Sequence, residues 1–440
     1  MTLRTDAVSF NDAIGPAEIL SIDWRDKKNQ PGQRPEDIEV HVHTYHTFQT
    51  LEGLGGSFNE IGWNALASLD EDKRKEVISK LFGPSPDSAF TFCRMPIGAS
   101  DFATDAYSLD DTAGDYTMEH FTVERDEKGL IPYIKAAQAE NPKLKIHASP
   151  WSPPGWMKTS GKMDGGDGLL IDEERIYRAY ALYFRRFIEE YEARGIPIDR
   201  VMVQNEPDAN SSFPNCHMEP ETLIKFTVDY LAPELKNAGL NTSIWGGTFR
   251  GITGLQSHRC MADTRYRETV GGVGFQYAFA GDIQELTQLY PGTPVMHTES
   301  VCWRGENSDL QAAALFLDFV DHMKAGCTAY TYWNMILDET SSSSWSWSQN
   351  SLIQIDRNSG EVTYHPDFQV MNLLGSCLKL GTKRVESFCF AARSIAFQNP
   401  DGEVVIFVLN PGDEREAVFE VDGRSAKQLI PARSIVVVTL

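Results

Sequence analysis

Two glutamates, Glu206 and Glu299, each follow a short apolar segment and each precede loop-forming residues. The 93 positions between them leave room for about three strand–helix units of an α/β barrel. At the C-terminal ends of barrel strands four and seven, the two acids would face each other across the barrel mouth. Paired carboxyl groups suit glycoside hydrolysis, in which one donates a proton and the other attacks the sugar carbon. The alternative is two surface glutamates among 62 acidic residues, but the strand-end context of both favours chemistry.

The elements that would position these acids can be read from hydrophobic periodicity. Stretches with helical periodicity, such as 173–194, separate most of eight short apolar segments that end in Gly, Pro or polar residues. Strands that alternate with helices predict a parallel (β/α)8 TIM barrel. The expected strands are 53–58, 91–98, 144–151, 200–207, 242–247, 272–278, 294–300 and 329–335.

After about residue 376 the hydrophobic period changes to two. Strand-like segments at 394–398, 404–410, 417–421 and 434–440 are separated by turns rich in Asn, Pro, Gly and Asp. This pattern predicts an attached antiparallel β-sandwich domain. Segment 39–49 also alternates and is expected to join the same sheet. The expected boundaries are 1–50 for an N-terminal segment that contributes strands to the sandwich, 51–375 for a catalytic barrel and 376–440 for the sandwich.

The composition limits the classes of partner. With 41% hydrophobic and 23% charged residues, the chain is typical of a globular protein. Its net charge of −22 disfavours nucleic acid and anionic membrane surfaces and favours a neutral ligand. The sequence contains no apolar run of the length that spans a membrane.

The N-terminal residues and the cysteines indicate a compartment. The first ten residues lack the apolar core of a signal peptide. The seven cysteines are an odd number without framework spacing, which predicts free thiols. We therefore expect a cytoplasmic protein, or a secreted one if a signal has been removed. Cys302, close to Glu299, has no Cys–His pattern around it and is expected to pack in the core.

Six stretches occur in an order that is typical of one enzyme family. They are Gly-Leu-Gly-Gly-Ser-Phe-Asn-Glu at 53–60, Arg-Met-Pro-Ile-Gly-Ala-Ser-Asp-Phe at 94–102, Ala-Ser-Pro-Trp-Ser-Pro-Pro-Gly-Trp-Met-Lys-Thr at 148–159, Gln-Asn-Glu-Pro at 204–207, His-Thr-Glu-Ser at 297–300 and Trp-Ser-Trp-Ser-Gln-Asn-Ser at 345–351. Through them nearly the whole chain resembles glycoside hydrolase family 30, which includes the acid β-glucosidases that act on glucosylceramide. The resemblance implies a retaining β-glycosidase with a barrel and an attached β-sandwich.

The resemblance also implies the roles of individual residues. Glu206 matches the general acid/base, which needs a pKa raised by a partly apolar pocket and a nearby carboxylate. Glu299 matches the nucleophile and must stay ionised; Arg94 is the expected donor, although a structural ion pair is compatible with the same position. Asn205 resembles the residue that hydrogen-bonds the sugar 2-OH, with strand capping as its alternative.

Further residues resemble a sugar-binding site. Trp151, Trp333 and Trp345 match its aromatic walls, because pyranose C–H groups pack on indole rings; filling of the core is the alternative. Glu60 and Asp101 follow the first two expected strands, where acids accept hydrogen bonds from sugar hydroxyls.

Two positions depart from the glucocerebrosidase pattern. Family members with that activity have Asp in place of Glu60 and His in place of Gln276. Gln276 and the adjacent Tyr277 are still expected to contact the substrate. These departures preserve the retaining chemistry but leave the sugar and the aglycone open.

We interpret the chain as a β-glucosidase of the glucosylceramidase-like type, acting on a neutral carbohydrate or glycoside without a metal or cofactor. An endo-β-1,6-glucanase or a β-xylosidase is the alternative within the family. An inactive carbohydrate-binding protein is disfavoured because both acids are present. The motif His41-Val-His43 suggests a metal-dependent amidohydrolase as a further alternative. However, the pair precedes the first expected barrel strand. It also lies in an alternating segment, where the histidines are expected on an exposed strand face.

Overall fold

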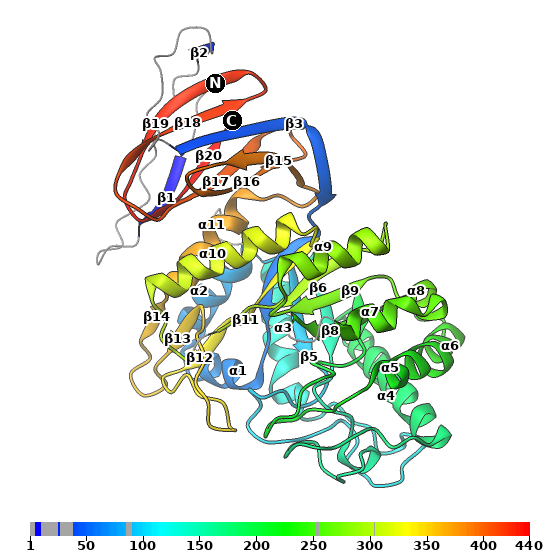
Figure 1. Ribbon diagram of the computed structural model, residues 1–440. Helices are drawn as coiled ribbons and strands as arrows, with labels where there is room; N and C mark the ends of the chain where they lie inside the picture. The colour runs from blue at the N-terminus through cyan, green and yellow to red at the C-terminus, as the bar shows by residue number, and fades with distance from the viewer. Residues whose placement is uncertain (1–4, 10–24, 27–37, 85–89, 252–254, 303) are drawn as a thin grey trace.

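The computed structural model describes residues 5–9, 25–26, 38–84, 90–251, 255–302 and 304–440. Figure 1 shows a barrel with its surrounding helices below and a sheet domain above it. Among the described residues, no helix is both long and apolar enough to cross a bilayer. All seven cysteines are free thiols, and five of them are buried.

The barrel is built from eight parallel strands, as the sequence predicts. Hydrogen-bonded neighbours follow chain order, and the barrel closes where the Thr328 N–H donates to the carbonyl oxygen of Val295 at 2.8 Å. Gly55 allows two strands to lie close together, because a Cβ there would be 1.9 Å from the carbonyl oxygen of Phe92. The strands are β4 (Gly53–Ser57), β5 (Phe92–Pro96), β6 (Lys145–Ser149), β7 (Arg200–Met202), β8 (Ser243–Arg250), β9 (Val273–Gln276), β10 (Val295–Glu299) and β11 (Ala329–Asn334).

Helices surround the barrel. Helix α4 confirms the prediction for 173–194: Ile176, Tyr180 and Phe187 are buried on one face, because residues three and four apart share a helix face. The helices are α1 (Glu60–Ala67), α2 (Glu71–Phe82), α3 (Leu130–Glu140), α4 (Glu174–Ala193), α5 (Pro220–Phe226), α6 (Ala232–Asn237), α7 (Leu255–Ala262), α8 (Thr264–Thr269), α9 (Ala280–Leu289), α10 (Asp309–Lys324) and α11 (Pro366–Cys377). A small sheet of β12 (Ile336–Asp338), β13 (Ile353–Ile355) and β14 (Val362–Tyr364) follows the last barrel strand.

The second sheet combines strands from both ends of the chain. Strand β3 (Ile38–Thr50) lies between β15 and β18, antiparallel to the first and parallel to the second. The sheet is therefore mixed rather than purely antiparallel, because the two neighbours of β3 run in opposite directions. The other strands are β1 (Thr5–Ser9), β2 (Arg25–Asp26), β15 (Lys383–Cys389), β16 (Arg393–Gln398), β17 (Val404–Asn410), β18 (Arg415–Val421), β19 (Arg424–Ile430) and β20 (Ser434–Thr439).

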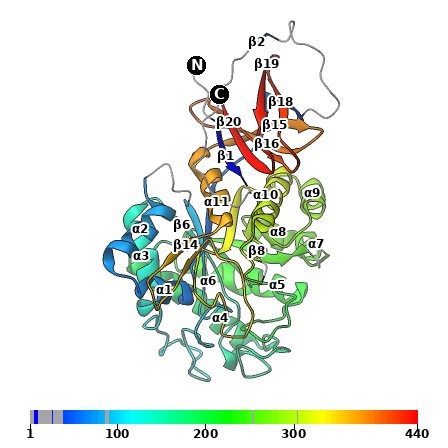
Figure 2. The same ribbon diagram turned by 90° about the vertical axis from the view of Figure 1, so that its left-hand side faces the viewer.

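The sandwich rests on helices α10 and α11, which lie between it and the barrel in both views (Figures 1 and 2). Strand β17 is buried along its whole length because its two faces serve two cores. Val405 and Phe407 join the barrel core, whereas Ile406 and Val408 join the interior of the sandwich. The ring of Phe316 on α10 lies 6.5 Å from that of Phe407.

This interface predicts that the sandwich supports the barrel. Deleting 380–440 would expose the apolar surface of α10 and α11, and we expect no soluble monomer. The milder change Phe407→Ala should lower the free energy of unfolding by about 3–5 kcal/mol. Phe390→Ala is the control, since Phe390 is 82% exposed, and should change it by no more than about 0.5 kcal/mol. Denaturant unfolding measures both; a truncated protein of unchanged stability would refute the prediction.

Candidate active site

A pocket of about 260 Å³ opens at the C-terminal ends of the barrel strands and contains both glutamates. This is the end of the barrel at which TIM-barrel enzymes place their active sites. Six of the lining residues are among those that the sequence indicated. The lining consists of Asp101, Trp151, Asn205, Glu206, Ser211, Phe213, Arg250, Tyr277, Glu299, Trp347 and Gln349.

The backbone at Glu206 is held by both neighbouring strands. The N–H of Asn205 donates to the carbonyl oxygen of Pro150 at 2.8 Å, and the N–H of Glu206 donates to that of Thr248 at 3.1 Å. Glu206 has a φ of 45° and Tyr277 one of 53°, values in the left-handed region that cost a non-glycine residue about 1–3 kcal/mol. The backbone hydrogen bonds hold Glu206 in this conformation, and the side chains of both residues line the pocket.

The surroundings of Glu206 favour its protonated form. The side chain is buried and accepts a hydrogen bond of 2.9 Å from Nε2 of Gln276. Burial and the negative charge of Glu299 raise the pKa of Glu206 to about 7. Arg250, whose Nη1 lies 3.9 Å from Oε2, and the hydrogen bond from Gln276 both oppose the shift without cancelling it. A carboxylic acid that keeps its proton near neutral pH can act as a general acid.

The surroundings of Glu299 favour its ionised form relative to Glu206. Its Oε2 accepts a hydrogen bond of 2.6 Å from Nη1 of Arg94, and its Oε1 accepts one from the hydroxyl of Tyr277. Burial raises the pKa of Glu299, while Arg94 and Tyr277 oppose that shift. Of the two acids, Glu299 has the closer cation, which favours the carboxylate form there and the proton on Glu206.

Arg94 connects the acids to the barrel wall. Its side chain is fully buried and its Nη2 donates to Oδ1 of Asn205 at 2.6 Å and to Oγ of Ser149 at 2.8 Å. The guanidinium lies over the ring of Trp151, 4.5 Å from the centroid. Arg94 is thus both the donor to Glu299 and part of a structural network, so both roles expected for this residue are present.

Hydrogen bonds to the side-chain oxygen of Asn205 fix the orientation of its amide group. Besides Arg94, the hydroxyl of Thr248 donates to its Oδ1 at 3.1 Å, and Gln276 contacts the same atom at 3.4 Å. With the oxygen engaged in this way, the amide N–H groups of Asn205 are available to donate to a sugar hydroxyl. Gln276 itself is fully buried and is not part of the pocket lining; it contacts Asn205 and Glu206, which are.

The structure changes the assignment of the aromatic walls. Trp151 lines the pocket, whereas Trp333 is buried behind it and stacks on it with ring centroids 5.2 Å apart. Trp345 donates from Nε1 to Asp164 at 3.1 Å, and it is Trp347 that lines the pocket. Ser346 between the two indoles has a φ of 71°, a sharp turn that gives them different contacts.

Of the two acids after the first strands, only Asp101 lines the pocket. The predicted sugar contact at Glu60 is not found there: its carboxylate pairs with Arg125 at 3.1 Å and accepts a hydrogen bond of 2.7 Å from the N–H of Thr104. Asp101 is buried, and its Oδ1 has no hydrogen-bond partner within the described chain. Burial and the charges of Glu299 and Glu206 raise the pKa of Asp101 well above its usual value.

Five lining residues were not predicted. Trp347 and Gln349 belong to the stretch 345–351, where alternation could have indicated them. Arg250 forms three hydrogen bonds with Asp208, the shortest being 2.9 Å, and no local signal in the sequence connects these two residues. The remaining two lining residues that were missed are Ser211 and Phe213.

Two other groups considered from the sequence lie outside the pocket lining. His41 is on β3 in the sandwich, 3.3 Å from Glu39 and 3.4 Å from Glu420, so the His-x-His pair is not at the barrel mouth. Cys302 is buried, which raises the pKa of its thiol to about 12. A thiol of that pKa is a poor nucleophile, and Cys302 packs in the core.

Fold and site together define a barrel enzyme with a paired-glutamate centre, an arrangement suited to cleaving glycosides. The chain belongs to glycoside hydrolase family 30: residues 51–354 match the family's TIM-barrel domain and residues 381–438 its beta sandwich domain. It is therefore a glycoside hydrolase of the retaining type.

The relatives of this chain include proteins named as glucosylceramidases and proteins named as endo-1,6-beta-D-glucanases. It is 30% identical to putative glucosylceramidase 1 of Caenorhabditis elegans over 401 residues, covering 85% of this chain and 76% of the relative. It is 27% identical to endo-1,6-beta-D-glucanase BGN16.3 of Trichoderma harzianum over 405 residues, covering 86% and 81%. The crystal structure of SrfJ from Salmonella typhimurium has a TM-score of 0.90 at 24% identity, covering 100% and 99% of the two chains, and supports the fold.

Proposed function

We propose that this glycosidase hydrolyses β-linked glucosides, with Glu206 as general acid/base and Glu299 as nucleophile. The observation that carries the proposal is the contrast between two acids in one pocket. Glu206 is buried beside a carboxylate and an amide, whereas Glu299 is bound by a guanidinium and a phenol. Two carboxyl groups whose surroundings favour different protonation states are the usual basis for separate acid and nucleophile roles.

The reaction then has two steps. The Glu299 carboxylate attacks the anomeric carbon while the Glu206 proton passes to the departing oxygen, which leaves a covalent glycosyl–enzyme. Glu206, now a carboxylate, takes a proton from water as the water attacks the same carbon and releases Glu299. Two inversions at one carbon retain its configuration. Arg94 and Tyr277 stabilise the charge that returns to Glu299 when the sugar leaves.

The protonation states predict a bell-shaped pH profile. For a β-glucoside with a poor leaving group, kcat/KM should fall above pH about 7, because Glu206 loses the proton it must donate. On the acid side it should fall as the pair takes up a second proton, because Glu299 is then no longer a carboxylate. In Glu206→Gln the alkaline limb should disappear. Profiles of both proteins test this, and an alkaline limb that persists in the variant would assign it to another group.

A second candidate within the proposed class is an endo-β-1,6-glucanase. Ser211, Arg250 and Gln349 line the pocket and offer hydrogen bonds to a leaving group that carries hydroxyls. The fungal relative named as an endo-1,6-glucanase supports this alternative. Phe213 and Trp347, whose rings meet edge-on at 4.5 Å, supply an apolar surface that a sugar face or a lipid can use.

A substrate panel tests the proposal and separates the candidates. Aryl β-glucoside, xyloside, fucoside and galactoside should be compared with a β-1,6-glucan and a glucosyl-lipid, using Glu299→Gln as the control for contaminating activity. We expect the glucoside to be the preferred aryl substrate and the first-formed product to be the β-anomer by NMR. Failure to cleave any β-glucoside would overturn the proposal. The ratio of glucan to glucosyl-lipid hydrolysis decides between the two candidates.

A further inference from the structure

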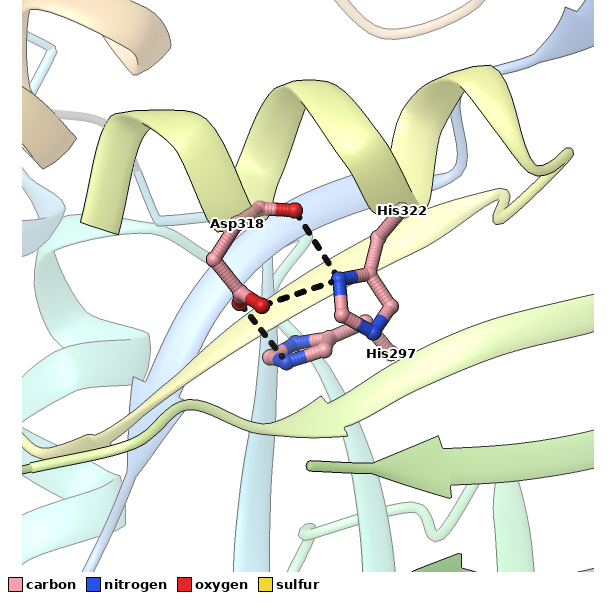
Figure 3. Close-up of side chains that lie close together, drawn as sticks. All are labelled: His297, Asp318 and His322. Carbon is pink, nitrogen blue, oxygen red and sulfur yellow. Dashed lines mark hydrogen bonds and ion pairs between the residues drawn. The ribbon is translucent and has the colours of Figure 1, made fainter. Parts of the chain in front are cut away.

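Behind the nucleophile strand lies a second cluster of groups that the proposed reaction does not use. His297 is on β10, two residues before Glu299, and Asp318 and His322 share one face of helix α10. Figure 3 shows the three side chains facing one another, two from the helix and one from the strand below it. One donor atom from each residue can be chosen such that all lie within 4.8 Å of one another.

Each histidine nitrogen lies near a different oxygen of Asp318, so the carboxylate would hold a shared ion through both oxygens or after a small rotation. Nε2 of His297 lies 3.4 Å from Oδ2 of Asp318, and Nδ1 of His322 lies 3.2 Å from Oδ1. Zinc holds imidazole nitrogen and carboxylate oxygen at about 2.0–2.2 Å in a tetrahedron, which places neighbouring ligand atoms about 3.3 Å apart. A charged hydrogen bond between the same groups would be shorter, about 2.7–2.9 Å.

The histidine on the strand lacks a hydrogen-bond partner for its inner nitrogen. His297 is 1% exposed, and its Nε2 has no partner among the described residues. The ring is fixed in place by stacking on Tyr330, with centroids 3.9 Å apart and planes at 6°. The Thr331 N–H donates to Nδ1 of His297 at 3.4 Å, so Nε2 carries the ring proton, which an ion bound there would displace to solvent. A buried ring held in this way is preorganised to present Nε2 to an ion.

The groups of α10 also hold one another without an ion. Nδ1 of His322 contacts the carbonyl oxygen of Asp318 at 2.9 Å, and the hydroxyl of Tyr330 donates to Oδ2 of Asp318 at 2.5 Å. Binding at His322 Nδ1 must therefore replace the proton of that contact, which passes to solvent. The Tyr330 hydroxyl would remain as an outer partner of the ligating carboxylate, an arrangement common around protein metal sites.

An entry path reaches the cluster from outside the active-site pocket. The side chain of Asp318 is 31% exposed. With Tyr330, Ser300 and Gln311 it lines a separate pocket of about 190 Å³. This opening gives a solvated ion access to the carboxylate. It also leaves room for a water molecule to complete a site with three protein ligands.

We propose that His297, Asp318 and His322 bind a divalent transition-metal ion of the zinc type, with water in the fourth position. The ion would join helix α10 to strand β10 behind Glu299 and stabilise the folded protein. This differs from the metal-free protein that the sequence indicated. Two of the ligands lie on a helix and one on a strand, at a spacing that no familiar zinc pattern has.

The test uses the full-length protein after chelator treatment. Calorimetric titration with Zn²⁺ should show one equivalent bound, and saturating Zn²⁺ should raise the Tm of the protein. Mg²⁺ prefers oxygen ligands and should neither bind nor raise the Tm. Co²⁺ should give the intense visible bands of a tetrahedral site without the near-ultraviolet charge-transfer band of a thiolate. That spectrum distinguishes this cluster from a site formed by the free cysteines.

Variants assign the binding to the cluster. Asp318→Asn and His322→Gln should each weaken Zn²⁺ binding at least about 100-fold, because even residues outside the ligand set cost 10–100-fold. His217→Gln is the matched control: His217 pairs with Glu219 at 3.0 Å on the surface, and its loss should leave binding unchanged. Circular dichroism tests whether each variant is folded. If His322→Gln is unfolded, binding to the nearly isosteric Asp318→Asn decides whether the cluster holds the ion. Absence of one-equivalent binding, a thiolate spectrum, or binding unchanged in the variants would overturn the proposal and leave the cluster as an ion pair only.

Discussion

Glu299→Gln should abolish hydrolysis of every β-glycoside, whatever its leaving group. The amide that replaces the carboxylate cannot attack the anomeric carbon, so no glycosyl–enzyme forms. The fold should be retained, because Gln has the same shape as Glu, its one oxygen can accept the hydrogen bond from Arg94, and its amide N–H can donate to the hydroxyl oxygen of Tyr277. Steady-state assays on dinitrophenyl and methyl β-glucosides measure the loss, and circular dichroism provides the structural control.

Glu206→Gln should discriminate between leaving groups. A dinitrophenolate is a weak base that departs without a proton, so its glycosylation step should survive in this variant. Methyl or glycosyl leaving groups need the proton and should react on the order of 10²–10⁴-fold more slowly, the usual contribution of general acid–base catalysis. Pre-steady-state kinetics on the dinitrophenyl substrate should show a burst, because the glycosyl–enzyme accumulates when water lacks its base.

Azide separates the two roles further. It needs no base, so added azide should restore turnover of the dinitrophenyl glucoside in Glu206→Gln and give the β-glycosyl azide. Glu299→Gln has no glycosyl–enzyme for azide to intercept. Equal impairment of both variants on both substrates, with rescue of neither, would contradict the assignment. So would rescue confined to Glu299→Gln with a β-configured product, because retention requires a glycosyl–enzyme, whereas direct attack of azide on the β-glucoside inverts the carbon.

Arg94→Gln is expected to damage both stability and rate. Removing the guanidinium leaves Glu299 as a buried carboxylate without its cation, which typically costs about 3–5 kcal/mol of folding free energy. Loss of a donor that stabilises charge at the reacting centre typically lowers kcat by about 10²–10³-fold. The pKa of Glu299 should also rise, because a cation that lowers it is gone, so the acid limb of the pH profile should move to higher pH.

A matched variant controls for the loss of an arginine–glutamate pair as such. Arg125 pairs with Glu60 at 3.1 Å, but its side chain is 31% exposed. Arg125→Gln should therefore leave the acid limb in place. An acid limb that moves equally in both variants would show that Arg94 does not set the ionisation of Glu299.

The parts of the site that sequence could predict are those fixed by local chain geometry. Glu206 and Glu299 were found because each ends an apolar segment, and parallel barrel strands bring their C-terminal ends together. Glu299 does end β10, whereas β7 is shorter than the predicted strand 200–207 and ends at Met202, so that Glu206 lies on the loop after it. The strands themselves were found because a run of buried residues bounded by Gly or Pro is a local pattern. Asp101, which follows the second expected strand, and Trp151, which was matched through the family resemblance, also line the pocket.

What the sequence could not predict depends on turns and on distant partners. Whether Trp345 or Trp347 faces the substrate is decided by the left-handed backbone at Ser346. Whether Glu60 is free for a sugar depends on Arg125, 65 positions further along the chain. Contacts of this kind arise only when separate loops meet, and hydrophobic periodicity carries no information about them.

The position of β3 has a consequence for synthesis on the ribosome. Ile38, Val40 and Val42 are fully buried in the sandwich, yet their hydrogen-bonded neighbours begin at Lys383 and Arg415. At about 5–20 residues per second, roughly 20–70 s pass between translation of Thr50 and of β15. For that time the nascent chain carries an unpaired apolar strand while the barrel forms behind it. In that interval a chaperone, or the strand's own Glu and His side chains, would have to keep it from pairing with other chains.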